Sequence, residues 1–276
     1  MFALTRVVKD LIASPGRSSS SPSSSPSSDR GAGLRTLARV AFGPVAALPR
    51  TALGLPDLLL ALGQRGAAIP AERRRTPNAT LALKALAGVV RSTGPVRESY
   101  LSLLTATMDR SVADEVHPAF IDLLGQLGDD ELRLLATLGT PGPYPLVSVS
   151  SRLRHGGASR VELHHFSLLG ERAGCARPDR TPSYLDNLNR LGLVEIRPTR
   201  VTDDVRMFNE LETHPRVASV RARIESQPEV RIGPLSEGIV ADVQYKSLFV
   251  TPFGQQFRAA CFFRPDHDSA LARPPS

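Results

Sequence analysis

Tryptophan is absent from the 276-residue sequence, and aromatic residues make up only 5% of it. A hydrophobic core must therefore consist mainly of Leu, Val and Ala side chains. Cysteine is also scarce, because only Cys175 and Cys261 are present, too few for a disulfide framework or a cysteine metal cluster. Cys261 stands beside Phe257 and Phe262 in a predicted final helix, where we expect a buried thiol.

Segments that enter or cross membranes are missing as well. Residues 1–12 are too short for a secretory signal and carry Lys9 and Asp10. No run of apolar residues reaches the roughly eighteen that a membrane-spanning helix needs. We therefore expect a cytoplasmic protein whose cysteines are reduced.

The sequence also lacks the motifs of common catalytic sites. It has no glycine-rich phosphate loop and no G-x-S-x-G motif. His117 is the most suggestive single residue, but its neighbours Asp114 and Glu115 come with no nucleophile in a recognisable arrangement. A histidine that hydrogen-bonds the backbone at a helix start is the favoured interpretation. We predict that the protein is not an enzyme and has no catalytic residue and no cofactor.

A metal site is not predicted either. His164 and His165 lie in the segment 161–175, whose apolar spacing predicts a helix. Adjacent residues of a helix point in different directions, so this pair would supply one ligand at most. Cys175 stands alone, and no other His or Cys lies at ligand spacing from the pair.

Positive charge is concentrated in the N-terminal third. Residues 1–97 hold 14 Lys and Arg against 4 Asp and Glu, residues 98–144 hold 2 against 8, and residues 145–276 hold 18 against 15. Only three of the 34 basic residues are lysine, a ratio typical of GC-rich coding bias. The net charge of +7 thus has two open explanations, which are a partner of the N-terminal third and codon drift.

The composition predicts an N-terminal segment and a disordered Ser/Pro tether over residues 1–33, and a basic, partly helical extension over residues 34–97. The apolar run Leu58–Leu62 and nearby arginines fit weak contact of residues 34–75 with anionic lipid at the inner membrane face. Short helices packed on the main domain are the favoured alternative, because prolines interrupt the apolar segment. The three arginines at 73–75 are compatible with contact to lipid or nucleic acid, but a solvated loop without such a partner is the favoured interpretation.

An acidic helical block with leucines inside is predicted over residues 98–144. Helices are expected over 81–90 and 96–108, then from Pro118 to 127, and a further helix is capped by Asp129. Gly128 separates the last two helices. The tail 264–276 is predicted to be disordered.

The order of helix and strand signals predicts a winged-helix-like domain over residues 145–263. Leu185, Leu188 and Leu191 form one apolar stripe on a helix that begins near Pro182 and ends at Gly192. A strand follows over 193–196. This order of helix, glycine and strand is typical of the third helix of a winged helix and its first wing strand.

The second wing strand is predicted over 245–250, and Thr251 caps a helix whose first residue is Pro252. Nearly fifty residues separate Ile196 from Tyr245, where a simple wing needs about a dozen. Their spacing predicts helices, with Asp203 and Asp204 as caps. The predicted fold is therefore mainly α with a small antiparallel β-sheet, in which a helical block precedes a winged-helix-like unit with a helical insertion in the wing.

Three pieces of the chain, in this order, carry a family resemblance: HPAFIDLLGQLGDDELRLLATL (117–138), YLDNLNRLGLVEI (184–196) and LFVTPFGQQFRAAC (248–261). Over roughly residues 98–262 the chain resembles the Abi-alpha family, bacterial proteins associated with abortive infection against phage. The resemblance implies a role in phage defence and brings no catalytic residue. We therefore predict a non-enzymatic intracellular protein of phage defence that acts through protein–protein or surface binding to an unknown protein partner.

The alternative function is a winged-helix DNA-binding transcription regulator. Ser183, Asn187 and Arg190 would face outward from the 182–191 helix, and Asn and Arg side chains read base edges. Asp186 on the same face repels phosphates, and DNA affinity needs several cations. Protein contact is therefore favoured over DNA contact.

Overall fold

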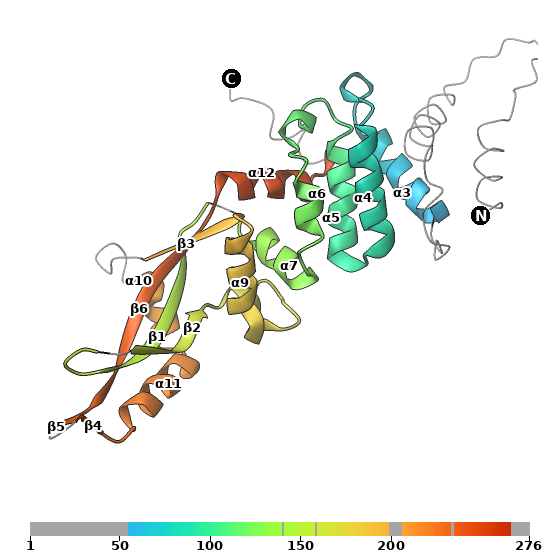
Figure 1. The fold of residues 1–276 in the computed structure, drawn as a ribbon. Coiled ribbons are helices and arrows are strands. Elements are labelled where there is room, and N and C mark those ends of the chain that lie inside the picture. Colours follow the sequence, from blue (N-terminus) through green and yellow to red (C-terminus); the bar gives the residue numbers. More distant parts are fainter. Residues whose placement is uncertain (1–54, 140, 158, 199–205, 233–234, 266–276) are drawn as a thin grey trace, which may run out of the picture. The chain divides into compact units, whose positions relative to one another are not determined.

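The computed structural model describes residues 55–265, except residues 140, 158, 199–205 and 233–234. Contacts divide the chain into two compact units (Figure 1): unit 1 comprises residues 1–127 and 256–276, and unit 2 comprises residues 128–255. Within the described ranges, no helix is long and apolar enough to cross a membrane. The predicted tether 1–33 and tail 264–276 lie outside these ranges apart from residues 264 and 265.

The described part of unit 1 is helical. Its helices are α3 (Leu55–Ala68), α4 (Ala79–Arg91), α5 (Gly94–Ala106), α6 (Phe120–Leu124) and the end of α12 (Pro252–Cys261). Two short 3-10 turns, η1 (Ala71–Arg73) and η2 (Ala113–Glu115), lie between them. The predictions of helices over 81–90 and 96–108 are confirmed. The apolar run Leu58–Leu62 forms part of the 14-residue helix α3, in which Leu62 is buried and Leu60 is exposed.

Close packing of α4 on α5 depends on a glycine. A Cβ atom added at Gly88 would lie 2.5 Å from the ring of Tyr100 on α5, so no larger residue fits there. The Tyr100 hydroxyl donates a hydrogen bond to the carbonyl oxygen of Ile121 at 3.2 Å, which ties α5 to α6. The rings of Phe120 and Phe257 meet edge to face with centroids 5.3 Å apart. Leucine and alanine side chains thus make up most of this core, as the scarcity of aromatic residues predicts, and Phe120 and Phe257 add one aromatic pair.

The predicted helix that begins at Pro118 is wrong in its bounds. Residues 118 and 119 form a turn, and α6 begins at Phe120 and ends at Leu124. The Nδ1 atom of His117 accepts a hydrogen bond from the N–H of Ala119 at 3.1 Å, so the side chain satisfies the backbone in a turn and not in a longer helix. Cys261 is buried in unit 1 as a free thiol, which confirms the prediction for this residue.

The side chains of the three arginines at 73–75 hydrogen-bond to other residues of unit 1. Arg73 donates to both carboxylate oxygens of Asp109, at 3.0 and 2.7 Å, and Asp109 is fully buried. Arg74 donates to the carbonyl oxygen of Ile69 at 2.8 Å, and Arg75 pairs with Asp114 at 2.8 Å. The favoured interpretation of a solvated loop is therefore wrong for these side chains, which are half-buried: carboxylates of the segment after α5 accept from Arg73 and Arg75, and backbone carbonyls accept from Arg74.

Unit 2 is built on a four-stranded antiparallel sheet with strand order β2-β1-β6-β3 (Figure 1). The strands span Tyr144–Leu153 (β1), Ser159–Phe166 (β2), Val194–Pro198 (β3) and Ile239–Val250 (β6). β1 and β6 pair without interruption from Tyr144↔Leu248 to Leu153↔Ile239. A separate pair, β4 (Val230–Ile232) and β5 (Leu235–Glu237), precedes β6.

Helices α7 (Asp129–Thr137), α8 (Leu169–Arg172), α9 (Thr181–Arg190), α10 (Arg206–Glu212) and α11 (Pro215–Glu225) complete unit 2. The last two pack on the sheet and bury a cluster formed by Val147, Val149, Leu163, Phe166, Phe208, Leu211, Val217 and Ile224. The predicted helices between β3 and β6 are thus confirmed, and the reason for them is that they cover one face of the sheet. The predicted caps Asp203 and Asp204 lie outside the described residues.

Local signals placed the elements around α9 correctly. α9 contains Pro182 in its first turn, and Gly192 follows it with φ of +73°, a left-handed conformation that glycine adopts without strain. The Thr251 hydroxyl accepts a hydrogen bond from the N–H of Gly254 at 2.9 Å, so the predicted cap of α12 is confirmed. The predicted cap Asp129 is wrong, since it is the first residue of α7; the N–H of Gly128 donates to the carboxylate of Glu131 at 2.7 Å.

The predicted helix over 161–175 is also wrong. Residues 159–166 form strand β2, which pairs with β1, and only 169–172 are helical. Leu163 and Phe166 fit one face of a helix, but pairing with β1 places both in the sheet core. The coarse prediction of helices with an antiparallel sheet is confirmed. The predicted domain bounds stay a prediction, and α7, expected in the helical block, lies in unit 2.

Candidate functional site

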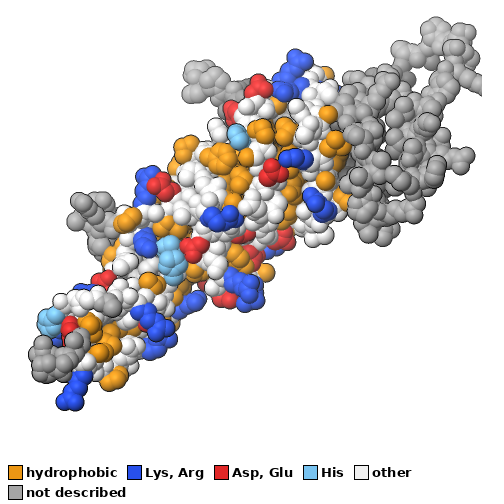
Figure 2. Space-filling model, in the orientation of Figure 1, with side chains coloured by type: hydrophobic (Ala, Val, Ile, Leu, Met, Phe, Trp, Pro, Cys, Tyr) orange, Lys and Arg blue, Asp and Glu red, His pale blue; other side chains and the backbone are white. Residues whose placement is uncertain are grey.

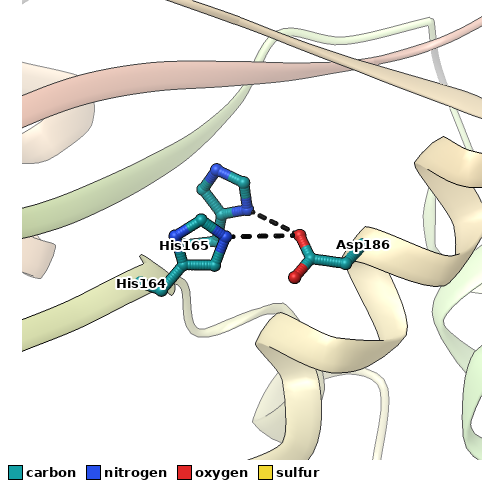
Figure 3. A group of neighbouring side chains, drawn as sticks. All are labelled: His164, His165 and Asp186. Atoms are coloured by element: carbon teal, nitrogen blue, oxygen red, sulfur yellow. Dashed lines mark hydrogen bonds and ion pairs between the residues drawn. The ribbon is translucent and has the colours of Figure 1, made fainter. Parts of the chain in front are cut away.

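The side chains of His164, His165 and Asp186 meet within unit 2, and we call them the His–Asp cluster (Figure 3). His164 and His165 lie near the end of β2, and Asp186 lies on α9. One carboxylate oxygen, Oδ1 of Asp186, lies 2.9 Å from Nδ1 of His165 and 3.5 Å from Nε2 of His164. Each of the three residues offers one atom that could bind a metal ion, and these three atoms lie within 4.8 Å of one another.

A bulge in β2 brings the two histidines to the same side. Val147 pairs with Phe166 and Val149 pairs with Leu163, so the two histidines face the single residue Ser148 of β1. Such a bulge re-aims side chains that a regular strand would send to opposite faces. The imidazole rings of His164 and His165 consequently stack, with centroids 3.7 Å apart and planes inclined by 32°.

The bulge includes a strained backbone conformation. His165 has φ of +42°, and it is the one non-glycine residue with positive φ in the described part of the chain. Its N–H donates to the hydroxyl oxygen of Ser148 at 3.1 Å, and Ser148 is itself buried. Left-handed backbone is uncommon for a side-chain-bearing residue and concentrates at sites where the surroundings fix it.

Both ring nitrogens of His165 are engaged. Nδ1 faces Asp186, and Nε2 lies 3.1 Å from the ammonium nitrogen of Lys246 on β6. Since the ammonium group only donates, Nε2 accepts, and Nδ1 carries the proton and donates to Asp186. The ring is buried, and burial lowers its pKa; the hydrogen bond to Asp186 opposes this effect, while the charges of His164 and Lys246 add to it, and the net pKa is below the usual value. The contact with Lys246 therefore fits the neutral form of His165, in which Nε2 carries no proton.

The residues predicted for DNA contact lie elsewhere on α9. Ser183 is exposed. Asn187 donates from Nδ2 to the carboxylate of Glu131 on α7 at 2.7 Å, and Arg190 donates to Oδ1 of Asn187 at 3.1 and 2.7 Å. Asn187 and Arg190 thus hydrogen-bond to each other and to α7.

Sequence reasoning missed the His–Asp cluster because its premise was a helix at 161–175. The bulge depends on the pairing of β2 with β1, and the carboxylate comes from a residue 21 positions after His165. The alternation of Leu163 and His165 with Glu162 and His164 was the one local sign of a strand in this segment.

The model of the family described as abortive infection alpha matches residues 57–261. The chain belongs to this family. Because the match covers most of the chain, it confirms the suspected family and extends beyond the resemblance at 98–262 towards the N-terminus. It also includes the His–Asp cluster. Membership implies that this abortive infection alpha protein has a defence role of the abortive-infection type. No curated protein and no solved structure matches the chain.

Proposed function

We propose that this abortive infection alpha protein is a non-enzymatic protein of phage defence that acts inside the cell by binding a partner protein. Family membership over residues 57–261 is the observation that carries the proposal. Both ring nitrogens of His165 are occupied by Asp186 and Lys246, so neither faces a hydroxyl or thiol as nucleophilic catalysis requires. This arrangement argues against His165 as the base that activates a nucleophile.

Phage plating tests the defence role. We expect a host that carries the gene to reduce the plating of at least one phage in a broad panel, compared with a host that carries an empty vector. His164→Asn and Asp186→Asn at equal protein levels should retain the reduction, since the proposed function assigns them no chemical step. Equal plating of every phage on both hosts would contradict the defence role, and loss of protection in both variants would give the His–Asp cluster a part in defence that the proposed function does not assign.

The second candidate function is a winged-helix DNA-binding regulator. The strand order β1-β6-β3, with α7, α8 and α9 ahead of β3, supports a winged-helix-like arrangement to which β2 and the α10–α11 insertion are additions. Charge opposes DNA binding, because basic side chains are interspersed with acidic ones on the face drawn in Figure 2. The pairing of Arg190 with Asn187 also occupies the side chains that would read bases.

A gel-shift titration against genomic fragments at low and moderate salt separates the two functions. A regulator would bind saturably at moderate salt and lose this binding in Arg190→Ala but not in Arg160→Ala, an exposed cation of β2. We expect no saturable binding at moderate salt.

Contact of residues 34–75 with anionic lipid is part of the surface-binding proposal. Residues 34–54 lie outside the described ranges, and the guanidinium groups at 73–75 bind within unit 1. We therefore assign such contact to the basic residues before Leu55.

A further inference from the structure

We propose that His164, His165 and Asp186 form a binding site for a divalent first-row transition metal ion, with Zn²⁺ as the ion that suits the ligand set. Two imidazoles and one carboxylate are ligands that Zn²⁺ takes in proteins. This proposal is independent of the proposed partner binding. It concerns unit 2 alone.

The three atoms that would bind the ion are spaced like the ligand atoms around one small metal ion. Zn²⁺ bonds to His and Asp are about 2.0–2.2 Å long, so two ligand atoms of a tetrahedral site lie about 3.4 Å apart. The distances from Oδ1 of Asp186 to Nδ1 of His165 and Nε2 of His164, 2.9 and 3.5 Å, bracket this value. The third pair lies within 4.8 Å. Side-chain rotations that unstack the two imidazole rings would therefore bring the three atoms to the ligand distances of one ion.

The backbone supplies a second, independent observation. A regular strand separates adjacent side chains onto opposite faces, and here two residues opposite Ser148 and a positive φ at His165 bring the rings together. Bulges and strained residues concentrate beside functional sites. Stacked histidines against one carboxylate oxygen are the product of this strain (Figure 3).

Exposure of the cluster is uneven in a way that suits ion entry. The side chain of His165 is 10% exposed, while those of His164 and Asp186 are 46% and 48% exposed. One ligand is thus fixed in the interior and two border solvent. Three protein ligands leave a fourth position for water.

Lys246 opposes ion binding in this arrangement. When Nδ1 of His165 gives its lone pair to a metal, the neutral ring must carry its proton on Nε2, which faces the Lys246 ammonium at 3.1 Å. Two donors then face each other, so Lys246, which is only half-buried, must turn towards solvent. A group that accepts from Nε2 would instead strengthen the site, as partners of metal-bound histidines do.

The test is a calorimetric titration of the full chain, freed of metal by a chelator, with Zn²⁺, and a parallel titration with Co²⁺ followed by its visible absorption. We expect saturable binding of one ion. His164→Ala and Asp186→Asn should each weaken it by at least about tenfold, and Lys246→Gln should tighten it by about tenfold, because the amide oxygen accepts from Nε2. His164 is exposed, so its replacement leaves folding intact.

His155→Ala is the control, since His155 is a histidine of unit 2 that is 82% exposed and lies outside the cluster. It should bind Zn²⁺ like the unaltered chain. Equal affinity in the unaltered chain, His164→Ala and Asp186→Asn would overturn the proposal. Failure of Lys246→Gln to tighten binding would overturn the assignment of Nδ1 of His165 as a ligand.

Discussion

Asp130 is a buried carboxylate that links α7 to other helical parts of unit 2. Its side chain is 10% exposed and accepts four hydrogen bonds, two on each oxygen. Oδ1 accepts from the N–H of Ala176 at 2.8 Å and from Arg133 at 2.6 Å. Oδ2 accepts from the N–H of Arg177 at 3.0 Å and from the hydroxyl of Tyr184 at 3.1 Å. The carboxylate thus ties α7 to the α8–α9 connection and to α9.

Asp130→Asn keeps the shape of this side chain and replaces one acceptor oxygen by an amide donor. One or two of the four bonds are then lost and an N–H of the backbone is left facing a donor. Hydrogen bonds to a buried charge and unsatisfied donors each count for about 1–3 kcal/mol, so we expect a loss of about 3 kcal/mol in the free energy of unfolding. Urea denaturation followed by circular dichroism measures it as a lower midpoint.

The effect should depend on pH in a defined direction. Burial by itself raises the pKa of Asp130, but the bonds from Ala176, Arg177, Arg133 and Tyr184 outweigh it, and the net pKa lies below 3.8. A carboxyl group whose pKa is lower in the folded state stabilises the fold above its unfolded pKa, and this contribution disappears as pH falls through the folded pKa. The difference between the unaltered chain and Asp130→Asn should therefore be constant near pH 7 and shrink below about pH 4.

The control for this prediction is Asp179→Asn. Asp179 pairs with Arg177 on the surface, where both side chains are more than half exposed, so its replacement should leave the midpoint unchanged. Equal midpoints for the two variants would refute the reasoning. A difference that persists unchanged into acid would also refute it.

Three further predictions concern unit 1 and the N-terminal region. Asp109→Asn leaves Arg73 with a buried, uncharged partner, so we expect a loss of about 3 kcal/mol in the free energy of unfolding, and an unchanged urea midpoint would contradict it. Gly88→Ala places a methyl group 2.5 Å from the Tyr100 ring and should cost about 1–3 kcal/mol by the same assay, whereas a stabilised chain would contradict the close helix contact. In co-sedimentation with anionic vesicles at low salt, the full chain should pellet more than a chain that begins at Leu55, and equal pelleting would remove the lipid contact.

Short-range signals account for the parts of the fold that sequence reasoning predicted. Pro182, Gly192 and Thr251 mark helix ends through the backbone groups that they free or satisfy, so α9, β3 and the start of α12 were placed from neighbours along the chain. Strand β2 was misassigned because Leu163 and Phe166 suit a helix equally well, and only pairing with β1 decides between the two.

Long-range contacts account for the features that sequence reasoning missed. Arg73 donates a hydrogen bond to Asp109, which lies 36 positions later in the chain, and no local feature of either residue indicates this pairing. The bulge at His164 and His165 exists because two residues of β2 oppose one of β1, which no property of the two histidines signals. Asp186 was assigned to an outward face of its helix, and that face meets the bulge.

Liquid infection of a host at two phage doses tests the central claim, a defence role of the abortive-infection type, most directly. With fewer phages than cells, we expect the culture with the gene to keep growing while the culture with an empty vector lyses. With more phages than cells, we expect both cultures to collapse and the culture with the gene to release far fewer phages. Full phage release from infected cells with the gene, for every phage that infects the host, would contradict the account.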